Sequence, residues 1–266
     1  MVFEILTNHW HQLIHSGDPR TQHLPFVRDP TVAICASISY LIIVTLGPKV
    51  MERREPLTIR KILIGYNFFS VVFSVWMMWE FASCSILNPN FNVFCQDLDE
   101  TDTSPIAMRL VNAHWCYFFS KFIELFDTIF FVVRKKNNQI SFLHVYHHVS
   151  MVILQWCLIK YVPGGVSYFG PLLNCFIHSL MYAYYMLSAF GPHMQKYLWW
   201  KRYLTKMQMI QFTVMIMYLS NALRIGCRWW DAYSYVMLFF IVSLLFLFAN
   251  FYMKSNSTKK EVKKQE

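Results

Sequence analysis

Long apolar stretches dominate this chain, and they restrict its fold more than any other feature does. The 266 residues are 56% hydrophobic and only 15% charged, whereas about 25% are charged in an ordinary soluble domain. Apolar runs of about 18 residues or more predict transmembrane helices. Continuous runs of this length also exclude a membrane β-barrel, because the strands of a barrel alternate polar and apolar residues. The sequence therefore predicts an all-α, polytopic membrane protein.

Seven predicted spans follow one another, separated by short polar segments. They cover about residues 31–46, 62–82, 109–133, 140–161, 166–190, 203–223 and 232–253, and Gly47-Pro48 is expected to close the first. The chain thus divides into a lumenal segment at 1–30, a seven-helix membrane domain at 31–253 and a cytosolic basic tail at 254–266. No repeat relates the two halves.

Positive charges between the spans predict the orientation of the chain. Segments 49–61, 134–136 and 196–206, together with the tail, hold 17 of the 24 lysines and arginines, and the alternate segments hold six. Cytosolic loops of membrane proteins are the ones enriched in Lys and Arg. We therefore expect a lumenal N-terminus and a cytosolic C-terminus. The net charge of +9 then reflects membrane topology, and no nucleic-acid partner is expected.

Two further features indicate the endoplasmic reticulum membrane. The pair Lys263-Lys264 near the C-terminus resembles the dilysine signal that retrieves membrane proteins to this compartment and is read from the cytosol. Cys95 and Cys227 both fall on the predicted lumenal side, where disulfides can form. We predict that they pair, and the alternative is two free lumenal thiols.

Polar clusters interrupt three consecutive predicted spans. His144, His147 and His148 fall at i, i+3 and i+4, so they share one helix face. The neighbouring clusters are Lys121, Glu124, Asp127 and Thr128 in the preceding span and Asn174, His178, Tyr182 and Tyr185 in the following span. A charged side chain at the centre of a bilayer costs about 2.5–3.5 kcal/mol and usually marks function. We expect one shared site, and the alternative is a structural polar contact between helices.

Two chemistries compete for the histidine cluster. Membrane di-iron desaturases and hydroxylases use several histidine boxes, which need more ligands than the five histidines in or beside these spans supply. A mononuclear zinc site remains open. Alternatively, a neutral imidazole attacks a thioester and forms a reactive acyl-imidazole, while a neighbouring imidazole or carboxylate sets its tautomer.

Four ordered motifs resemble those of a known family. They are Lys121-x-x-Glu124-x-x-Asp127-Thr128, His144-x-x-His147-His148, Asn174-x-x-x-His178-x-x-Met181-Tyr182-x-Tyr184-Tyr185 and Thr205-x-x-Gln208-x-x-Gln211. In this order they resemble the signature boxes of the ELO family, the very-long-chain fatty acid elongases (3-oxoacyl-CoA synthases) of the endoplasmic reticulum. The resemblance covers about residues 30–253 and departs from none of the boxes.

The resemblance implies a decarboxylative Claisen condensation. Acyl-CoA and malonyl-CoA would give 3-oxoacyl-CoA, CO₂ and CoA, without a cofactor or a metal. It also implies seven helices, six of them in an inverted barrel around a tunnel that is closed at the lumenal end and open to cytosolic CoA. A reductase and a dehydratase that complete the elongation cycle, and other elongase subunits, are partners expected by resemblance. The preferred acyl chain cannot be inferred from the sequence.

Roles for the site residues form a hypothesis. His147 would take the acyl group in a ping-pong reaction, and His178 would steady the malonyl carboxylate or the enolate. Asn174, Gln208 and Gln211 would donate hydrogen bonds to developing negative charge. The residues expected to orient or balance His147 are Glu124, Asp127, His144, His148 and Lys121. Thr128, Tyr182 and Tyr185 are expected to bind the substrate. The two tyrosines could line the acyl tunnel, although they equally suit a lipid-facing surface.

Basic residues beside the spans suit the phosphates of CoA. They are Arg134, Lys135, Lys136, Lys201, Arg202 and Lys206, and a role in membrane topology alone is the alternative. Two other functions remain open. A metal-dependent membrane lipid hydroxylase or desaturase would contain metal after purification, and a seven-span transporter would have related halves or broken helices at matching positions.

Overall fold

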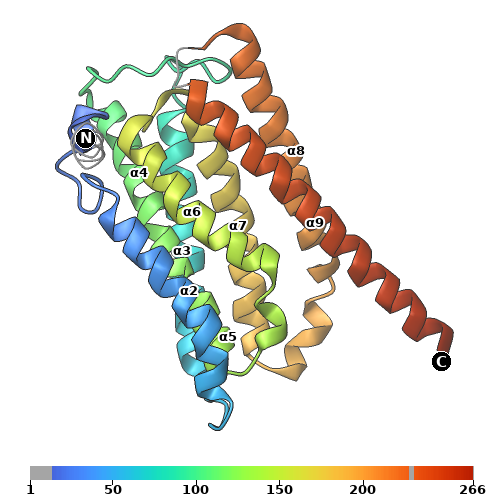
Figure 1. The fold of residues 1–266 in the computed structure, drawn as a ribbon. Helices are drawn as coiled ribbons and strands as arrows, with labels where there is room; N and C mark the ends of the chain where they lie inside the picture. Colours follow the sequence, from blue (N-terminus) through green and yellow to red (C-terminus); the bar gives the residue numbers. More distant parts are fainter. Residues whose placement is uncertain (1–13, 228–230, 266) are drawn as a thin grey trace, which may run out of the picture.

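All of the regular secondary structure in the described part of the chain is helical (Figure 1). The structure, a computed structural model, describes residues 14–227 and 231–265, and within these ranges it contains no β-strand, so the all-α prediction is confirmed. The helices are α2 (Thr31–Met51), α3 (Arg60–Cys84), α4 (Pro105–Glu124), α5 (Phe126–Val133), α6 (Phe142–Tyr161), α7 (Phe169–Ala189), α8 (Lys201–Ile225) and α9 (Asp231–Gln265). Short 3-10 turns are η1 (Pro19–Thr21), η2 (Asn137–Gln139), η3 (Gly165–Tyr168) and η4 (Pro192–Tyr197). The side chains of Lys263 and Lys264 lie outside the described part.

Four of the described helices are long and apolar enough to cross a membrane. They are α2, α3, α6 and the Ala232–Lys254 part of α9. The chain is therefore a multi-pass membrane protein, as predicted. Helices α4, α7 and α8 are less apolar, and α4 carries Arg109, Lys121 and Glu124.

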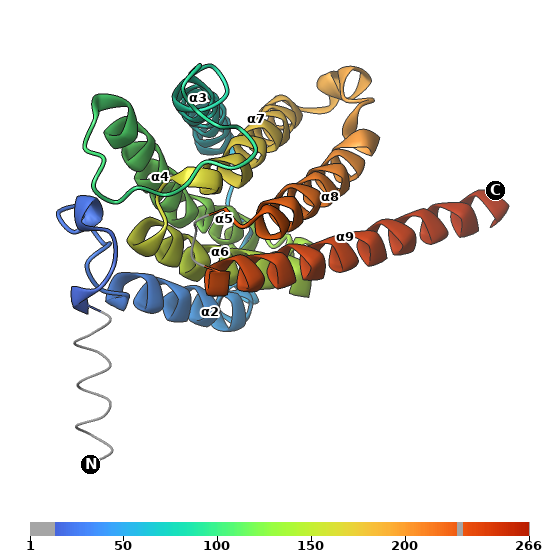
Figure 2. The same ribbon diagram turned by 90° about the horizontal axis from the view of Figure 1, so that it is seen from above.

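Six helices contact one another in a closed order. Each of α3, α4, α6, α9, α8 and α7 packs against the next, and α7 packs back against α3. Seen from above in Figure 2, these helices surround a common centre. Helices α2 and α5 pack together, and α2 also packs on the outside of α6. We call the six helices the ring.

The outer faces of the helices are apolar, and several inner positions are polar. On α3, for example, Phe68, Val72 and Trp79 are exposed, whereas Asn67, Ser70 and Ser74 are buried. This distribution is the reverse of that in a soluble bundle, and it suits a protein whose outer surface faces hydrocarbon.

The first helix is longer than predicted. Gly47-Pro48 does not close it, and α2 continues to Met51. Gly47 lies against α5, where an added Cβ would come within 2.8 Å of Val132 Cγ1. Gly47 therefore permits a close approach of two helices instead of ending one, and Pro48 is accommodated within the last turn of α2.

The third predicted span is divided into two helices. The boundary is at Leu125, where the N–H groups of Leu125 and Thr128 donate to carbonyl groups three residues earlier. Such tightened turns inside a helix are frequent at functional sites. Here the break separates Glu124, which faces α7, from Thr128, which faces α2 and α6.

The end of the molecule that holds the N-terminal segment is closed by several connections. We call residues 14–30, 85–104 and 162–168 the cap. Cys95 and Cys227 form a disulfide that joins the 85–104 loop to the end of α8. Tyr168 and Tyr218 both donate a hydrogen bond to the carbonyl of Val93 in the same loop.

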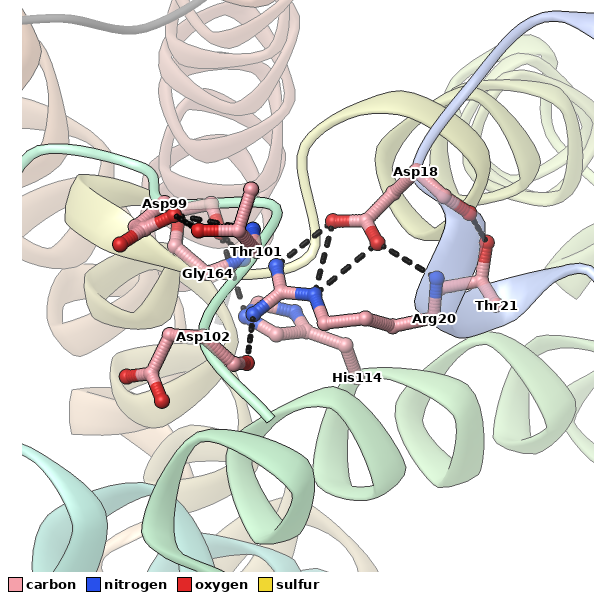
Figure 3. A network of polar contacts seen from close by, with 9 residues as sticks. Asp18, Arg20, Thr21, Asp99, Thr101, Asp102, His114 and Gly164 are labelled. Atoms are coloured by element: carbon pink, nitrogen blue, oxygen red, sulfur yellow. Dashed lines mark hydrogen bonds and ion pairs between the residues drawn. The ribbon is translucent and has the colours of Figure 1, made fainter. Parts of the chain in front are cut away.

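Arg20, held in a buried ion pair with Asp18, attaches the N-terminal segment to this loop (Figure 3). Arg20 Nη2 lies 2.6 Å from Asp18 Oδ2, and Arg20 Nη1 donates to the carbonyl of Asp102 at 3.0 Å. In the same loop the N–H and hydroxyl of Thr101 donate to Asp99, and these hydrogen bonds lower the pKa of the Asp99 carboxyl.

Lys160, at the end of α6, holds the N-terminal segment from the other side. Its ammonium donates to the carbonyls of Ile14 and Arg28 at 2.9 and 2.8 Å, and its own carbonyl accepts from Asp18 N. A Cβ at Gly17 would come within 2.5 Å of this carbonyl oxygen, so only glycine permits the approach.

Candidate active site

Helix α6 presents the three histidines in its first two turns. Ser141 Oγ accepts from the N–H of His144 at 3.2 Å and caps the helix. The imidazole centroids of His144 and His148 are 4.3 Å apart, and those of His147 and His148 are 5.3 Å apart. His148 therefore lies between the other two rings.

His144 faces away from the centre of the ring. Its Nε2 lies 2.6 Å from Thr128 Oγ1, and Thr128 Oγ1 lies 3.0 Å from the hydroxyl of Tyr40. This chain of hydrogen bonds links α6, α5 and α2. Thr128, a predicted substrate contact, is fully buried here as the partner of His144.

A buried charge cluster occupies the inner side of the break between α4 and α5. Lys121 Nζ lies 2.6 Å from Glu124 Oε1, and His178 Nδ1 lies 3.4 Å from the same oxygen. All three residues are less than a tenth exposed. The structure thus brings together Lys121 and Glu124 of the first motif and His178 of the third. Removing one member of a buried ion pair is far more costly than removing both.

Asn174 is oriented by two donors. Its Oδ1 accepts from Tyr117 OH at 2.8 Å and from Lys121 Nζ at 3.3 Å, and Lys121 Nζ also lies over the Tyr117 ring. An ammonium group has only donors, so the oxygen of the amide must face it. The amide nitrogen of Asn174 is therefore directed elsewhere and is available to donate.

Asp127 belongs to a separate pair. Tyr182 OH donates to Asp127 Oδ2 at 2.8 Å. The ring of Tyr182 contacts those of His178 and Tyr185 edge-on, at centroid distances of 5.8 and 6.2 Å. Tyr182 is buried, whereas Tyr185 is 40% exposed.

A cavity lies inside the ring. Its polar wall includes His147, Asn174 and Gln211, and its apolar wall includes Met151, Leu158, Phe212, Met237, Phe240 and Leu244. His147 and Leu158 are both on α6, and eleven residues of helix span about 16 Å. The cavity thus extends from the histidine box toward the cap, where Val166 and Ser167 also line it.

His147 is the only histidine of the box among the residues that line this cavity. The predicted site residues that do not line it are His144, His148, His178, Lys121, Glu124, Asp127, Thr128, Tyr182, Tyr185 and Gln208. Several of these residues support the wall from behind, as Lys121 does through Asn174.

Two basic clusters lie at the end of the molecule opposite the cap (Figure 1). Arg134, Lys135 and Lys136 follow α5, and Lys201, Arg202 and Lys206 lie in the first two turns of α8. Lys135 Nζ donates to the carbonyl of Glu52 at 3.0 Å. Five of the six are exposed, and Arg134 is half-buried, so their charges remain available to a phosphorylated ligand.

Within the described residues, no group of three or more His, Cys, Asp and Glu side chains is arranged to hold a metal ion. The cavity wall presents an imidazole and carboxamides. One carboxamide is held by an ammonium, and a second lies on α8.

Comparison with known sequences decides the family. The profile of the ELO family, described as GNS1/SUR4, matches residues 25–265. The chain belongs to the ELO family. This confirms the resemblance inferred from the four motifs, and the chain is an enzyme of the elongase family.

Individual relatives agree along most of their length. A very long chain fatty acid elongase of Aedes aegypti is 43% identical over 98% of this chain and 73% of its own. Very long chain fatty acid elongase 4 of Homo sapiens is 44% identical over 93% of this chain and 77% of its own. Very long chain fatty acid elongase 7 of Drosophila melanogaster is 45% identical over 92% of this chain and 75% of its own.

Several residues of this elongase-family site were not predicted from the sequence. Tyr117 orients Asn174, Tyr40 contacts Thr128, and Gln155 lines the cavity. A helical-face search would have found two of them, since Tyr117 precedes Lys121 by four residues and Gln155 follows His147 by eight. Tyr40 lies on another helix, and no sequence pattern indicates its contact.

Proposed function

We propose that this protein condenses a long-chain acyl-CoA with malonyl-CoA to give 3-oxoacyl-CoA, CO₂ and CoA, by a ping-pong route through acyl-His147. The observation that carries the proposal is that His147 lines an apolar cavity that extends about 16 Å toward the cap. A nucleophile at the polar end of a long apolar cavity suits an acyl thioester, whose reactive carbon is polar and whose chain is not.

In the first half of the reaction, a ring nitrogen of His147 attacks the thioester carbon. The C–S bond breaks, CoA leaves as a thiolate that takes up a proton, and an N-acyl imidazole remains. Negative charge develops on the carbonyl oxygen during the attack. The Asn174 and Gln211 amides both face the cavity and are the donors available to stabilise it.

In the second half, malonyl-CoA loses CO₂ and leaves an enolate. The enolate carbon attacks the acyl carbon and the C–N bond to His147 breaks. The departing ring nitrogen takes up a proton from water, which regenerates the imidazole, and 3-oxoacyl-CoA leaves. His178 stands beside Glu124 and Lys121, one turn of α7 beyond Asn174. It serves in this account as a positioning residue for the wall that receives the enolate.

We further propose that the protein lies in the endoplasmic reticulum membrane with seven spans, a lumenal cap and a cytosolic basic end. The six-helix ring supports the expected barrel, and the distribution of Lys and Arg supports the orientation. In this arrangement the two basic clusters meet the phosphates of cytosolic CoA, and no cofactor takes part. The reductase and dehydratase of the elongation cycle remain expected partners.

The test uses detergent-purified protein with malonyl-CoA and a panel of acyl-CoAs, without reductant or added metal. Mass spectrometry should find 3-oxoacyl-CoA two carbons longer than the substrate. His147→Ala should abolish the product. If folded His147→Ala kept normal condensation while His148→Ala lost it, the assigned nucleophile would be wrong. No product from any chain, with metal bound to the protein, would favour the lipid hydroxylase.

A further inference from the structure

The cavity wall contains one polar group that the condensation does not use. Beyond His147, Asn174 and Gln211, the polar residues that line the cavity are Tyr117, Gln155, Ser167, Tyr218 and Tyr233. The four hydroxyl groups in this set all donate to protein acceptors: Tyr117 to Asn174, Ser167 to Gly164, Tyr218 to Val93 and Tyr233 to Leu154. The carboxamide of Gln155 differs.

Gln155 is 3% exposed, and its Oε1 has no hydrogen-bond partner among the described residues. It lies on the cavity face of α6, between Met151 and Leu158, where the rest of the helix face is apolar. A buried amide oxygen without a partner is costly, and an apolar residue of the same size would avoid the cost. The position therefore favours a ligand that supplies the missing partner.

The place of Gln155 defines where such a ligand group must lie. Eight residues of α6 separate it from His147, which is about 12 Å along the helix axis. If the acyl carbon is bound at His147, as the proposed function requires, a chain that runs toward the cap passes Gln155 about 12 Å from its reactive carbon. We propose that Gln155 binds a hydroxyl group in the middle of the acyl chain, and that mid-chain hydroxyacyl-CoAs are substrates.

The chemistry of the amide favours a hydroxyl over a double bond. A carboxamide has both a donor and an acceptor, and a hydroxyl group complements either. A carbon–carbon double bond offers only a weak acceptor and cannot satisfy the oxygen. Because χ3 of glutamine is a soft torsion, either end of the amide can turn toward the chain. Sites built to bind a hydroxyl group also discriminate strongly against chains that lack one.

The experiment compares acyl-CoAs of one chain length with purified wild-type protein. One substrate is saturated, one carries a hydroxyl about 12 Å from the thioester carbon, and one carries the hydroxyl at the far end of the chain. We expect kcat/KM for the mid-chain isomer to exceed that for the far-end isomer by roughly tenfold or more. Equal values for the two isomers would overturn the inference without the need for any variant.

The variant Gln155→Met removes the amide with little change in size. The variant should still elongate the saturated acyl-CoA. The ratio of kcat/KM for the mid-chain hydroxyacyl-CoA to kcat/KM for the saturated acyl-CoA should fall by roughly tenfold. Met151→Leu, one turn nearer to His147, is the matched control and should change both rates by the same factor. An unchanged ratio in Gln155→Met would contradict the role of Gln155. Loss of product from every acyl chain in the wild-type protein would contradict the proposed function instead.

Discussion

The amide of Asn174 shows how one residue of the site is set by its neighbours. Tyr117 and Lys121 both donate to its oxygen, and Asn174 itself lines the cavity beside His147. With the oxygen engaged, the amide can meet the substrate only as a donor. This is the polarity that a developing oxyanion requires.

Replacing Tyr117 by phenylalanine tests this arrangement. Asn174 would keep only its longer bond to Lys121, so its amide would be held less firmly. We expect kcat to fall by up to roughly tenfold with little change in KM, because the lost interaction acts in the transition state. Steady-state kinetics check this. Tyr168→Phe, which removes a comparable bond to Val93 in the cap, should leave kcat unchanged.

The buried pair of Lys121 and Glu124 leads to a prediction about stability. Glu124→Gln alone leaves the Lys121 ammonium buried without a counter-charge and should destabilise the protein by about 3–5 kcal/mol. The double variant Lys121→Met with Glu124→Gln should be more stable than Glu124→Gln. Thermal unfolding in detergent provides the comparison. If the double variant lost as much stability as Lys121→Met and Glu124→Gln lose together, the two charges would not be coupled.

At the residue scale, the sequence identified the polar residues that are unusual in a membrane helix. Histidine, lysine and glutamate there are conspicuous because they are costly. An uncharged polar side chain is less conspicuous in a membrane helix, and the residues that were overlooked, Tyr117, Tyr40 and Gln155, are of this kind. The shared helix face of His144 and His147 did not predict their different surroundings, because these depend on α2 and α5, which reach the outer side of the box.

At the scale of helices, the apolar pattern predicted most boundaries within a few residues. The predicted span at 166–190 corresponds to Phe169–Ala189, and 140–161 to Phe142–Tyr161. The pattern failed at Gly47-Pro48, where tertiary packing against α5 extends the helix. It also failed at Leu125, because no glycine or proline marks the break between α4 and α5.

The contact between α2 and α5 leads to a prediction at the same scale. Gly47→Ala would place its Cβ 2.8 Å from Val132 Cγ1 and should force the helices apart, at a cost of about 1–3 kcal/mol. The strain would extend to Tyr40, Thr128 and His144, so activity should also fall. Adding Val132→Ala should restore part of the stability lost in Gly47→Ala. If the effects of Gly47→Ala and Val132→Ala on thermal stability simply added, Gly47 and Val132 would not be in close contact.

At the scale of the whole molecule, one end of the ring is closed and the other end carries the basic clusters. Cys95 and Cys227 are 132 residues apart in the chain, and their disulfide joins the 85–104 loop to the end of α8. The pairing was predicted from the compartment alone. The hydrogen bonds that Arg20 and Lys160 donate in the cap were not, because their acceptors are backbone carbonyls that a sequence does not place.

Removal of the disulfide should loosen the cap. Cys95→Ser with Cys227→Ser is expected to lower the free energy of unfolding by about 2–4 kcal/mol, since the bond constrains a long loop of the unfolded chain. Unfolding curves with and without reductant check this, and the wild-type curve under reductant should approach that of the double variant. A stability that does not respond to reductant in the wild-type protein would contradict the pairing.

The most direct measurement of the central claim omits malonyl-CoA. Purified protein is incubated with an acyl-CoA alone, quenched, digested and analysed by mass spectrometry. We expect release of about one equivalent of CoA and an added acyl mass on His147. This mass should be absent in His147→Ala and should be removed from the wild-type protein by malonyl-CoA. Condensation with both substrates present, but with no acylated His147 and no release of CoA in the first step, would contradict the acyl-histidine route.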